Sequence, residues 1–237
     1  MGVKVVVFDL DGTLLDTLED LADATNWALR KNGMPERALA EVRQFVGNGV
    51  RKLIERAVPE GEANPLFEQT FDDFKGYYVE HCQDKTCLYD GIAEMLRALK
   101  ERGFKLAIVS NKLQAGVDEL YDRYFRDTVA VAIGERPEIQ RKPAPDMVEL
   151  ALQALGVKKD EAVYVGDSDV DLQTARNSGL PCISVLWGFR DKDFLLAHGA
   201  NTLIASPTDL VNLLTSTQTP ALAQSAPMGG FSFSISK

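Results

Sequence analysis

The chain has 237 residues, of which 45% are hydrophobic and 26% are charged, a composition typical of a soluble globular protein with one large domain or a core with a smaller insert. Its net charge of −9 argues against sequence-independent nucleic-acid binding and gives no sign of a polybasic membrane anchor, since both need a basic surface. No apolar run reaches membrane-spanning length. The N-terminal apolar run is interrupted by an aspartate before it reaches the length of the apolar segment of a secretory signal. We therefore expect a cytoplasmic protein without nucleic-acid or membrane partners.

The first predicted element is the apolar run "VVVF" at residues 5–8, which ends directly at a pair of aspartates. Asp9 and Asp11 stand one residue apart, and Gly12 and Thr13 follow them. An Asp-Gly pair favours a tight β-turn, whereas an isolated D-x-D also occurs as a metal clamp in nucleotide-sugar transferases. This segment alone leaves both a solvated turn and a cation site open.

Residues 17–86 contain no convincing strand, and they predict a helical block that interrupts the chain after its first strand. Thr17 followed by Asp20 resembles a capping box, which would begin an amphipathic helix that ends at Gly33. Further helical patterns cover 39–46, 49–57 and 66–81.

From residue 91 onward, helical and strand patterns alternate. Helical patterns cover 92–102, 115–125, 145–155 and 169–179, and strand patterns cover 104–109, 128–133, 162–165 and 181–186. Such alternation indicates an α/β fold, a Rossmann-like parallel sheet with helices on both faces. We predict an α/β core of residues 1–16 and 87–214, a helical cap of residues 17–86, and a flexible tail or added extension at 215–237.

The residues that follow each strand are the informative ones, because ligands of open parallel sheets bind beyond the carboxyl ends of the strands. The polar residues at these positions are Asp9, Asp11, Ser110, Asn111, Lys112, Asp167, Ser168, Asp169 and Asp171, and Lys142 comes just before the predicted helix at 145–155. Carboxylates gathered at one edge repel one another unless a hard cation lies between them, and all-oxygen ligands select Mg²⁺. Ser110, Asn111 and Lys142 could hold phosphate oxygens. Neither histidine lies in these segments, which argues against a histidine-based triad.

In this order, the motifs resemble those of the haloacid dehalogenase superfamily of aspartate-nucleophile phosphotransferases. The resemblance covers nearly all of residues 3–214 and rests on four motifs: "DLDGT" (9–13), "SN" (110–111), "KP" (142–143) and "GDSDVD" (166–171). Within the superfamily the chain is most similar to phosphoglycolate phosphatases, with weaker support from "FVGNGVRKL", "SNK" and "WGFR". The resemblance implies a Mg²⁺-dependent phosphatase for a small phosphorylated metabolite, acting as a monomer or homodimer.

The resemblance also implies a role for each motif residue. Asp9 would attack phosphorus and form an aspartyl-phosphate, while Asp11 would protonate the leaving oxygen and later activate water. Mg²⁺ would bind Asp9, the main-chain carbonyl of Asp11, and Asp167, and Lys142 would neutralise charge on Asp9 and the phosphoryl group. The supporting positions would be Leu10, Gly12, Thr13, Ser110 and Asn111 around the phosphoryl group and Asp11, with Ser168 and Asp171 behind Lys142 and the metal ligands.

Substrate recognition is expected from the cap, where Arg43, Asn48 and Arg51 are candidates to bind a substrate carboxylate. Each arginine could equally be an ordinary exposed helix residue. Asp11 argues against carbon–halogen cleavage, because a halide leaving group needs no proton. The sequence leaves other functions open: a sugar phosphomutase, a pyrophosphatase or nucleotidase on the same site, a phosphonate-cleaving enzyme with a cap lysine, and a non-catalytic binding protein.

Overall fold

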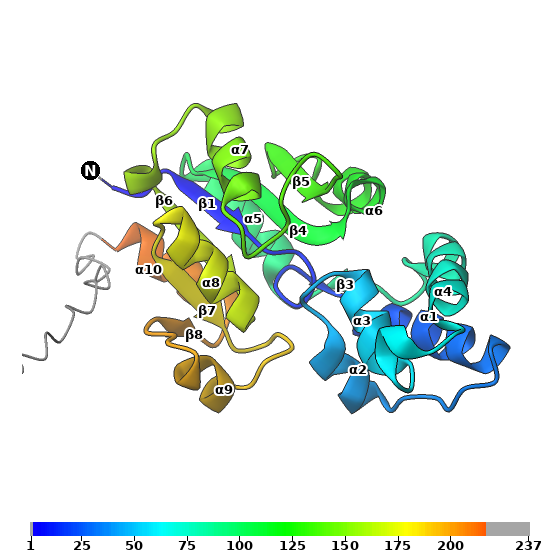
Figure 1. Ribbon diagram of the computed structural model, residues 1–237. Helices are drawn as coiled ribbons and strands as arrows, with labels where there is room; N and C mark the ends of the chain where they lie inside the picture. The colour runs from blue at the N-terminus through cyan, green and yellow to red at the C-terminus, as the bar shows by residue number, and fades with distance from the viewer. Residues whose placement is uncertain (1, 217–237) are drawn as a thin grey trace, which may run out of the picture.

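The computed structural model describes residues 2–216, and at its centre lies a six-stranded sheet in which every neighbouring pair is parallel (Figure 1). The strand order is β5-β4-β1-β6-β7-β8. The chain adds strands on one side of β1 and then on the other, which places the ligand crevice of such a sheet beside β1. The predicted α/β fold with a parallel sheet is confirmed. The strands are β1 (Val5–Phe8), β4 (Lys105–Leu113), β5 (Val131–Glu135), β6 (Ala162–Gly166), β7 (Cys182–Val185) and β8 (Leu203–Ile204).

Helices cover both faces of the sheet, and the alternation of side chains along β1 explains how both faces become apolar. Val6 and Phe8 belong to the cluster that includes α5, α6 and α10, whereas Val5 and Val7 belong to the cluster that includes α7 and α8. All four side chains are fully buried. The core helices are α5 (Ile92–Glu101), α6 (Gln114–Leu120), α7 (Asp146–Leu155), α8 (Asp169–Ser178), α9 (Lys192–Ala197) and α10 (Pro207–Thr215).

Four further helices form a separate group next to the sheet, and we call these helices α1–α4 the cap (Figure 1). They have a hydrophobic core of their own, which includes Leu29, Leu53, Ile54 and Phe74. The cap helices therefore pack their apolar faces mainly against one another, and Phe189 from the loop after β7 joins the same cluster; the exact domain boundaries stay a prediction. The cap helices are α1 (Leu18–Lys31), α2 (Leu39–Phe45), α3 (Val50–Ala57) and α4 (Phe67–His81).

The chain enters and leaves the cap through two linkers that pair with each other. The carboxylate of Asp20 accepts the main-chain N–H groups of Lys85 and Thr86 at 2.9–3.2 Å, which ties the start of α1 to the returning chain. The predicted capping box is wrong, because Asp20 is used by this distant partner and the hydroxyl of Thr17 makes no capping bond. The linkers contain the antiparallel strands β2 (Leu15–Asp16) and β3 (Cys87–Leu88).

Several other elements differ from their predicted extents. Strand β4 continues to Leu113, so Ser110 and Asn111 lie within it, and the predicted helix at 115–125 ends in a π-helical turn, Tyr121–Phe125. The sequence did not predict β8, α9 or α10. Of the predicted tail, Thr215 ends α10, and everything beyond residue 216 lies outside the described residues. Within residues 2–216, no helix is long and apolar enough to cross a membrane.

Candidate active site

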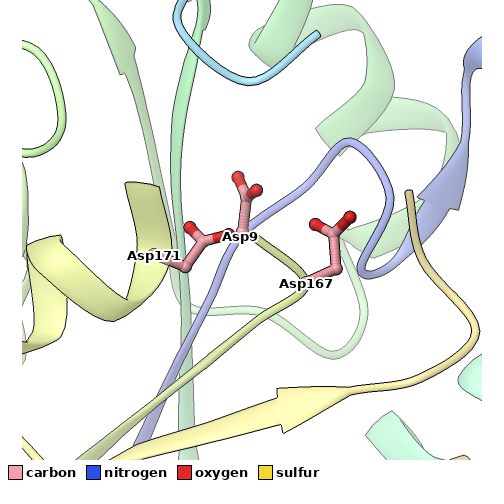
Figure 2. Close-up of side chains that lie close together, drawn as sticks. All are labelled: Asp9, Asp167 and Asp171. Atoms are coloured by element: carbon pink, nitrogen blue, oxygen red, sulfur yellow. The ribbon is translucent and has the colours of Figure 1, made fainter. Parts of the chain in front are cut away.

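Three aspartate side chains meet at the carboxyl edge of the sheet, as Figure 2 shows. Asp9 follows β1, Asp167 follows β6, and Asp171 lies in the first turn of α8. One carboxylate oxygen of each lies within 4.8 Å of the others, and all three residues are buried. The register explains this meeting, because Phe8 pairs with Val165 and the residues after the two neighbouring strands therefore emerge together.

The electrostatics of these carboxylates favour a bound cation. Burial, followed by the charge of Asp171, raises the pKa of Asp9 well above its usual value, although Lys142 opposes the shift. Burial and Asp171 also raise the pKa of Asp167 to about 7. Crowded, desolvated carboxylates gain most from a hard divalent ion, and their oxygen atoms are the ligands that Mg²⁺ prefers.

Asp171 differs from the other two aspartates because its own oxygens are already saturated. Its Oδ1 accepts from Lys142 Nζ and from the Tyr164 hydroxyl, both at 2.9 Å, and its Oδ2 accepts from the N–H and hydroxyl of Ser168 at 3.1 and 2.6 Å. Burial alone would raise the pKa of Asp171, but Lys142 and Ser168 outweigh it and hold that pKa below its usual value. Asp9 and Asp167 are thus the carboxylates with capacity for a metal.

Lys142 joins Asp171 to Asp9. Its Nζ lies 2.7 Å from Asp9 Oδ1 and 3.1 Å from the hydroxyl oxygen of Tyr164. The side chain is almost completely buried, so burial by itself would lower its pKa, but Asp171 and Asp9 raise that pKa above its ordinary value. Lys142 therefore carries a fixed positive charge beside the candidate nucleophile.

Asp167 is held in place by the loop after β7 and by the turn after β1. Its Oδ2 accepts the N–H of Phe189 at 2.7 Å, and its Oδ1 accepts the hydroxyl of Thr13 at 3.2 Å. The expectation that Thr13 braces the segment around Asp11 is not met by this bond, because the hydroxyl reaches Asp167 instead. Gly12 has φ +87°, and a Cβ there would lie 2.5 Å from Asp167 Oδ2, so only glycine fits this turn.

The main-chain donors expected around a phosphoryl group are only partly available. The N–H of Leu10 donates to Asp9 Oδ1 at 2.7 Å, and the N–H of Gly12 donates to the carbonyl of Leu15 at 2.9 Å. In this structure the turn itself uses both groups, which differs from the predicted phosphate-binding role of Leu10 and Gly12.

Ser110 and Asn111 lie at the same edge, on β4. The hydroxyl of Ser110 accepts the N–H of Lys112 at 3.1 Å. The Asn111 amide donates to the carbonyl of Lys142 at 3.0 Å and to that of Gly47 in the cap at 3.3 Å, while its buried Oδ1 has no hydrogen-bond partner. Asn111 thus holds the Lys142 segment and the loop before α3 near each other.

Asp11 is paired with a second buried lysine. Lys112 Nζ lies 3.0 Å from Asp11 Oδ1 and 2.7 Å from the hydroxyl of Tyr78, which belongs to α4 of the cap. Burial alone would lower the pKa of Lys112, but Asp11 and then Tyr78 raise that pKa above its usual value. The candidate proton carrier therefore touches a lysine that also touches the cap.

A cavity lies between the cap and the core, with different chemistry on its two sides. The core contributes a polar floor, whereas the cap contributes apolar side chains and the main chain of two glycines. The lining residues are Asp9, Asp11, Ser110, Asn111, Lys112 and Lys142 from the core, and Leu21, Val46, Gly47, Gly49, Val50 and Leu53 from the cap.

The cap residues predicted to bind the substrate do not line this cavity. Arg43 donates to the carbonyl of Gly188 at 3.0 Å and to Asp191 at 3.2 Å, so it contacts the core. Asn48 accepts from Arg56 within the cap. Arg51 lies on the exposed side of α3, where it pairs with Glu62 and Glu68. For Arg51 the geometry favours the ordinary exposed position.

Sequence reasoning missed Tyr78 and Tyr164, and it placed Lys112 after a strand without giving it a role. Lys112 follows the "SN" motif directly, so its position after a strand was the available signal. Tyr164 lies inside the apolar strand β6 and Tyr78 on the apolar face of α4, and neither pattern distinguishes a site residue from a core residue.

Comparison with known proteins gives a consistent family match. The model of the family described as haloacid dehalogenase-like hydrolase matches residues 6–185. A phosphoglycolate phosphatase from Aquifex aeolicus is 32% identical over 217 residues, which cover 90% of this chain and 97% of that protein.

Solved structures agree. A protein from Lactobacillus delbrueckii subsp. bulgaricus, provisionally named a phosphoglycolate phosphatase, is 36% identical with a TM-score of 0.86, over 90% of this chain and 99% of that one. CbbY from Rhodobacter sphaeroides, crystallised in complex with phosphate, is 26% identical with a TM-score of 0.70, over 88% of this chain and 96% of that one.

Proposed function

Because the chain belongs to the haloacid dehalogenase-like hydrolase family, we propose that it hydrolyses a small phosphomonoester through an aspartyl-phosphate on Asp9, with Mg²⁺ as cofactor. Its class, a phosphoric monoester hydrolase, follows from the family and the curated relatives. The observation that carries the proposed mechanism is the convergence of Asp9, Ser110 and Lys142 on one cavity, with Asp167 beside Asp9.

Mg²⁺ fits the donor set of the described residues. Asp9 and Asp167 are buried carboxylates with raised pKa values at the same edge of the sheet. Asp171 is excluded as a metal ligand because both of its oxygens already accept two hydrogen bonds each. The main-chain carbonyl of Asp11 is the third protein ligand that we propose. When bound, Mg²⁺ supplies positive charge that relieves the repulsion among the carboxylates and favours phosphoryl oxygens.

Asp9 is arranged for attack through one oxygen. The N–H of Leu10 and Lys142 engage Oδ1, which leaves Oδ2 as the freer nucleophile. In the first half-reaction an Asp9 oxygen bonds to phosphorus, the ester P–O bond breaks, and its electron pair stays on the leaving oxygen, which takes a proton from Asp11. In the second half-reaction water attacks phosphorus and gives a proton to Asp11, and Asp9 leaves as a carboxylate.

Charge stabilisation supplies most of the rate in this proposal. Enzymes accelerate phosphate-monoester hydrolysis by up to about 10²¹-fold, whereas one general acid contributes about 10²–10⁴-fold. Lys142, at a fixed position 2.7 Å from Asp9, and the Ser110 hydroxyl at the cavity floor bind the transferring group, and the apolar cap excludes water from it.

For the substrate we propose phosphoglycolate or a phosphomonoester of similar size. Relatives at 31–35% identity carry the name phosphoglycolate phosphatase. The cap side of the cavity offers small and apolar surfaces, which suits a compact substrate. The cytoplasmic location and the monomeric or dimeric state remain predictions.

A panel of phosphorylated metabolites tests the proposal. Phosphoglycolate, hexose phosphates, nucleotides and pyrophosphate are assayed for phosphate release with Mg²⁺ and with EDTA, using the wild type and Asp9→Asn. We expect Mg²⁺-dependent release that favours phosphoglycolate and is lost in Asp9→Asn, with mass spectrometry excluding deamidation. Full Mg²⁺-dependent activity of Asp9→Asn would eliminate the proposed nucleophile, and a preference for another ester would replace the proposed substrate.

A further inference from the structure

Lys112 lies at the boundary between the core and the cap and contacts both. It follows Asn111 on β4, and its Nζ lies 3.0 and 3.4 Å from the two carboxylate oxygens of Asp11. The same ammonium donates to the hydroxyl of Tyr78 at 2.7 Å, and that hydroxyl is carried by α4 of the cap. A single buried cation thus connects a motif aspartate with a cap helix.

Both side chains are fixed by their surroundings. A Cβ at Gly116 in α6 would lie 3.4–4.0 Å from three carbons of the Lys112 stem, so the stem runs closely over this glycine. The ring of Tyr78 stacks on Phe74 with centroids 5.3 Å apart. Lys112 is 5% exposed and Tyr78 is 8% exposed. Because packing restricts the movement of both side chains, the position of α4 helps to set the position of the Lys112 ammonium.

The two contacts of Lys112 with Asp11 are unequal. The ammonium lies nearer to Oδ1 than to Oδ2, which leaves Oδ2 the less engaged oxygen and the better one for a transferred proton. A cation at Oδ1 also stabilises the negative charge that forms on Asp11 as its proton departs. An ion pair on the protein surface would give little of this charge stabilisation, because water would screen it.

We propose that Lys112 and Tyr78 are positioning residues that hold Asp11 for proton transfer only while the cap is docked on the core. The inference rests on the proposed function, in which Asp11 is the proton carrier. Docking of α4 delivers Tyr78 to Lys112, and Lys112 orients the carboxyl group toward the leaving oxygen. Cap closure then enables the acid step as well as excluding water.

The leaving group of the substrate provides the test. A series of substituted phenyl phosphates keeps the size of the substrate nearly constant while the leaving oxygen varies in its need for a proton. p-Nitrophenolate departs without one, whereas phenolate and alkoxides need it. We expect Tyr78→Phe and Lys112→Met to reduce kcat/KM most for the poorest leaving groups and least for p-nitrophenyl phosphate. A positioning defect should remove about 10-fold or more of the 10²–10⁴-fold that a general acid supplies.

Matched controls come from the same helix. Tyr77→Phe alters the neighbouring tyrosine, whose ring stacks on Trp27, and Lys75→Met removes an exposed lysine paired with Asp72. Both should leave the leaving-group dependence unchanged. Tyr78→Phe deletes only a hydroxyl and keeps the ring, so it reports on the contact even if Lys112→Met fails to fold.

Asp11→Asn separates failure of this inference from failure of the proposed function. If Asp11→Asn itself loses the same activity on every leaving group, then Asp11 is not the proton carrier, and the acid step of the proposed function is wrong. If Asp11→Asn shows the steep dependence but Tyr78→Phe and Lys112→Met lower all substrates equally, only the inference is overturned. If the inference is right, adding Tyr78→Phe to Asp11→Asn causes no further loss of kcat/KM that depends on the leaving group.

Discussion

Two buried lysines each hold one aspartate of the "DLDGT" motif, and their surroundings differ in one important respect. The partners of Lys142 are Asp9, Asp171 and Tyr164, which all come from the α/β core. Lys112 has one partner from the core and one from the cap. Lys142 therefore holds Asp9, the proposed nucleophile, together with core side chains alone, whereas Lys112 makes the position of Asp11, the proposed proton carrier, depend on the cap as well.

The largest expected effect is that of Lys142→Met. Removing one partner of a buried ion pair costs about 3–5 kcal/mol, because Asp9 and Asp171 are left without their cation. We expect kcat/KM to fall by about 10³-fold, the upper range for removal of one charge-stabilising donor. The fold-loss should be equal for p-nitrophenyl phosphate and alkyl phosphates, since in the proposed mechanism Lys142 acts on the phosphoryl group and not on the leaving oxygen. Steady-state kinetics and urea unfolding measure the two effects.

Tyr164→Phe should have a smaller effect than Lys142→Met, because it deletes one hydroxyl and leaves the ion pair of Lys142 with Asp9 and Asp171. It removes a hydrogen bond to Asp171, worth about 1–3 kcal/mol. A loss from either variant that shrinks as the leaving group improves would show that Lys142 and Lys112 share a role, and it would end the contrast between them.

A second prediction concerns pH and Mg²⁺ at Asp167. Its pKa is raised to about 7 by burial and by Asp171, so the folded protein binds more protons than the unfolded chain between about pH 4 and 7. The metal-free protein should therefore lose stability as pH rises from 5.5 to 7.5, with a slope of at most about 1.4 kcal/mol per pH unit for this group. The lowered pKa of Asp171 acts only below this window.

Mg²⁺ competes with that proton, so its stabilising effect should grow with pH. Thermal unfolding with EDTA or with MgCl₂ at pH 5.5 and 7.5 measures both trends. Asp167→Asn is the control and should weaken both trends, while Asp9, whose pKa is also raised well above its usual value, keeps part of the pH slope. An Mg²⁺-induced rise in Tm that is equal at the two pH values in the wild type would remove Asp167 from the proposed ligands.

The same contrast between core and cap explains what the sequence could predict. Asp9 and Asp167 follow strands of a parallel sheet, and Lys142 lies in the loop between β5 and α7; the topology of the sheet brings such positions to one edge. Tyr78 and Lys112 meet only because α4 docks across the sheet edge, and an aromatic residue on an apolar helix face gives no sign of a polar contact. The predicted capping role of Asp20 fails for a similar reason, since its partner Lys85 lies in a linker 65 residues further along the chain.

A third prediction concerns Arg190, which joins the core loop after β7 to the cap. Its guanidinium donates to the carbonyls of Arg43 and Val46 at 2.8 and 2.7 Å. Arg190→Met should loosen cap docking and thereby displace Tyr78 from Lys112. We expect a smaller loss of kcat/KM than for Tyr78→Phe, but with the same bias toward poor leaving groups. Arg97→Met, at an exposed pair on α5, is the control. A uniform loss across leaving groups would separate cap docking from the acid step.

The smallest effect is expected for Arg51→Ala, on the exposed side of α3 and outside the cavity lining. Arg51 is 40% exposed at its side chain and forms ion pairs with Glu62 and Glu68. Exposed pairs contribute about 0–1 kcal/mol, so the change in the free energy of unfolding should be small. The ratio of kcat/KM for phosphoglycolate to that for simple alkyl phosphates should stay as in the wild type. A changed ratio would restore Arg51 as a substrate-binding residue, and it would require an arrangement of the cap in which the exposed side of α3 turns toward the substrate.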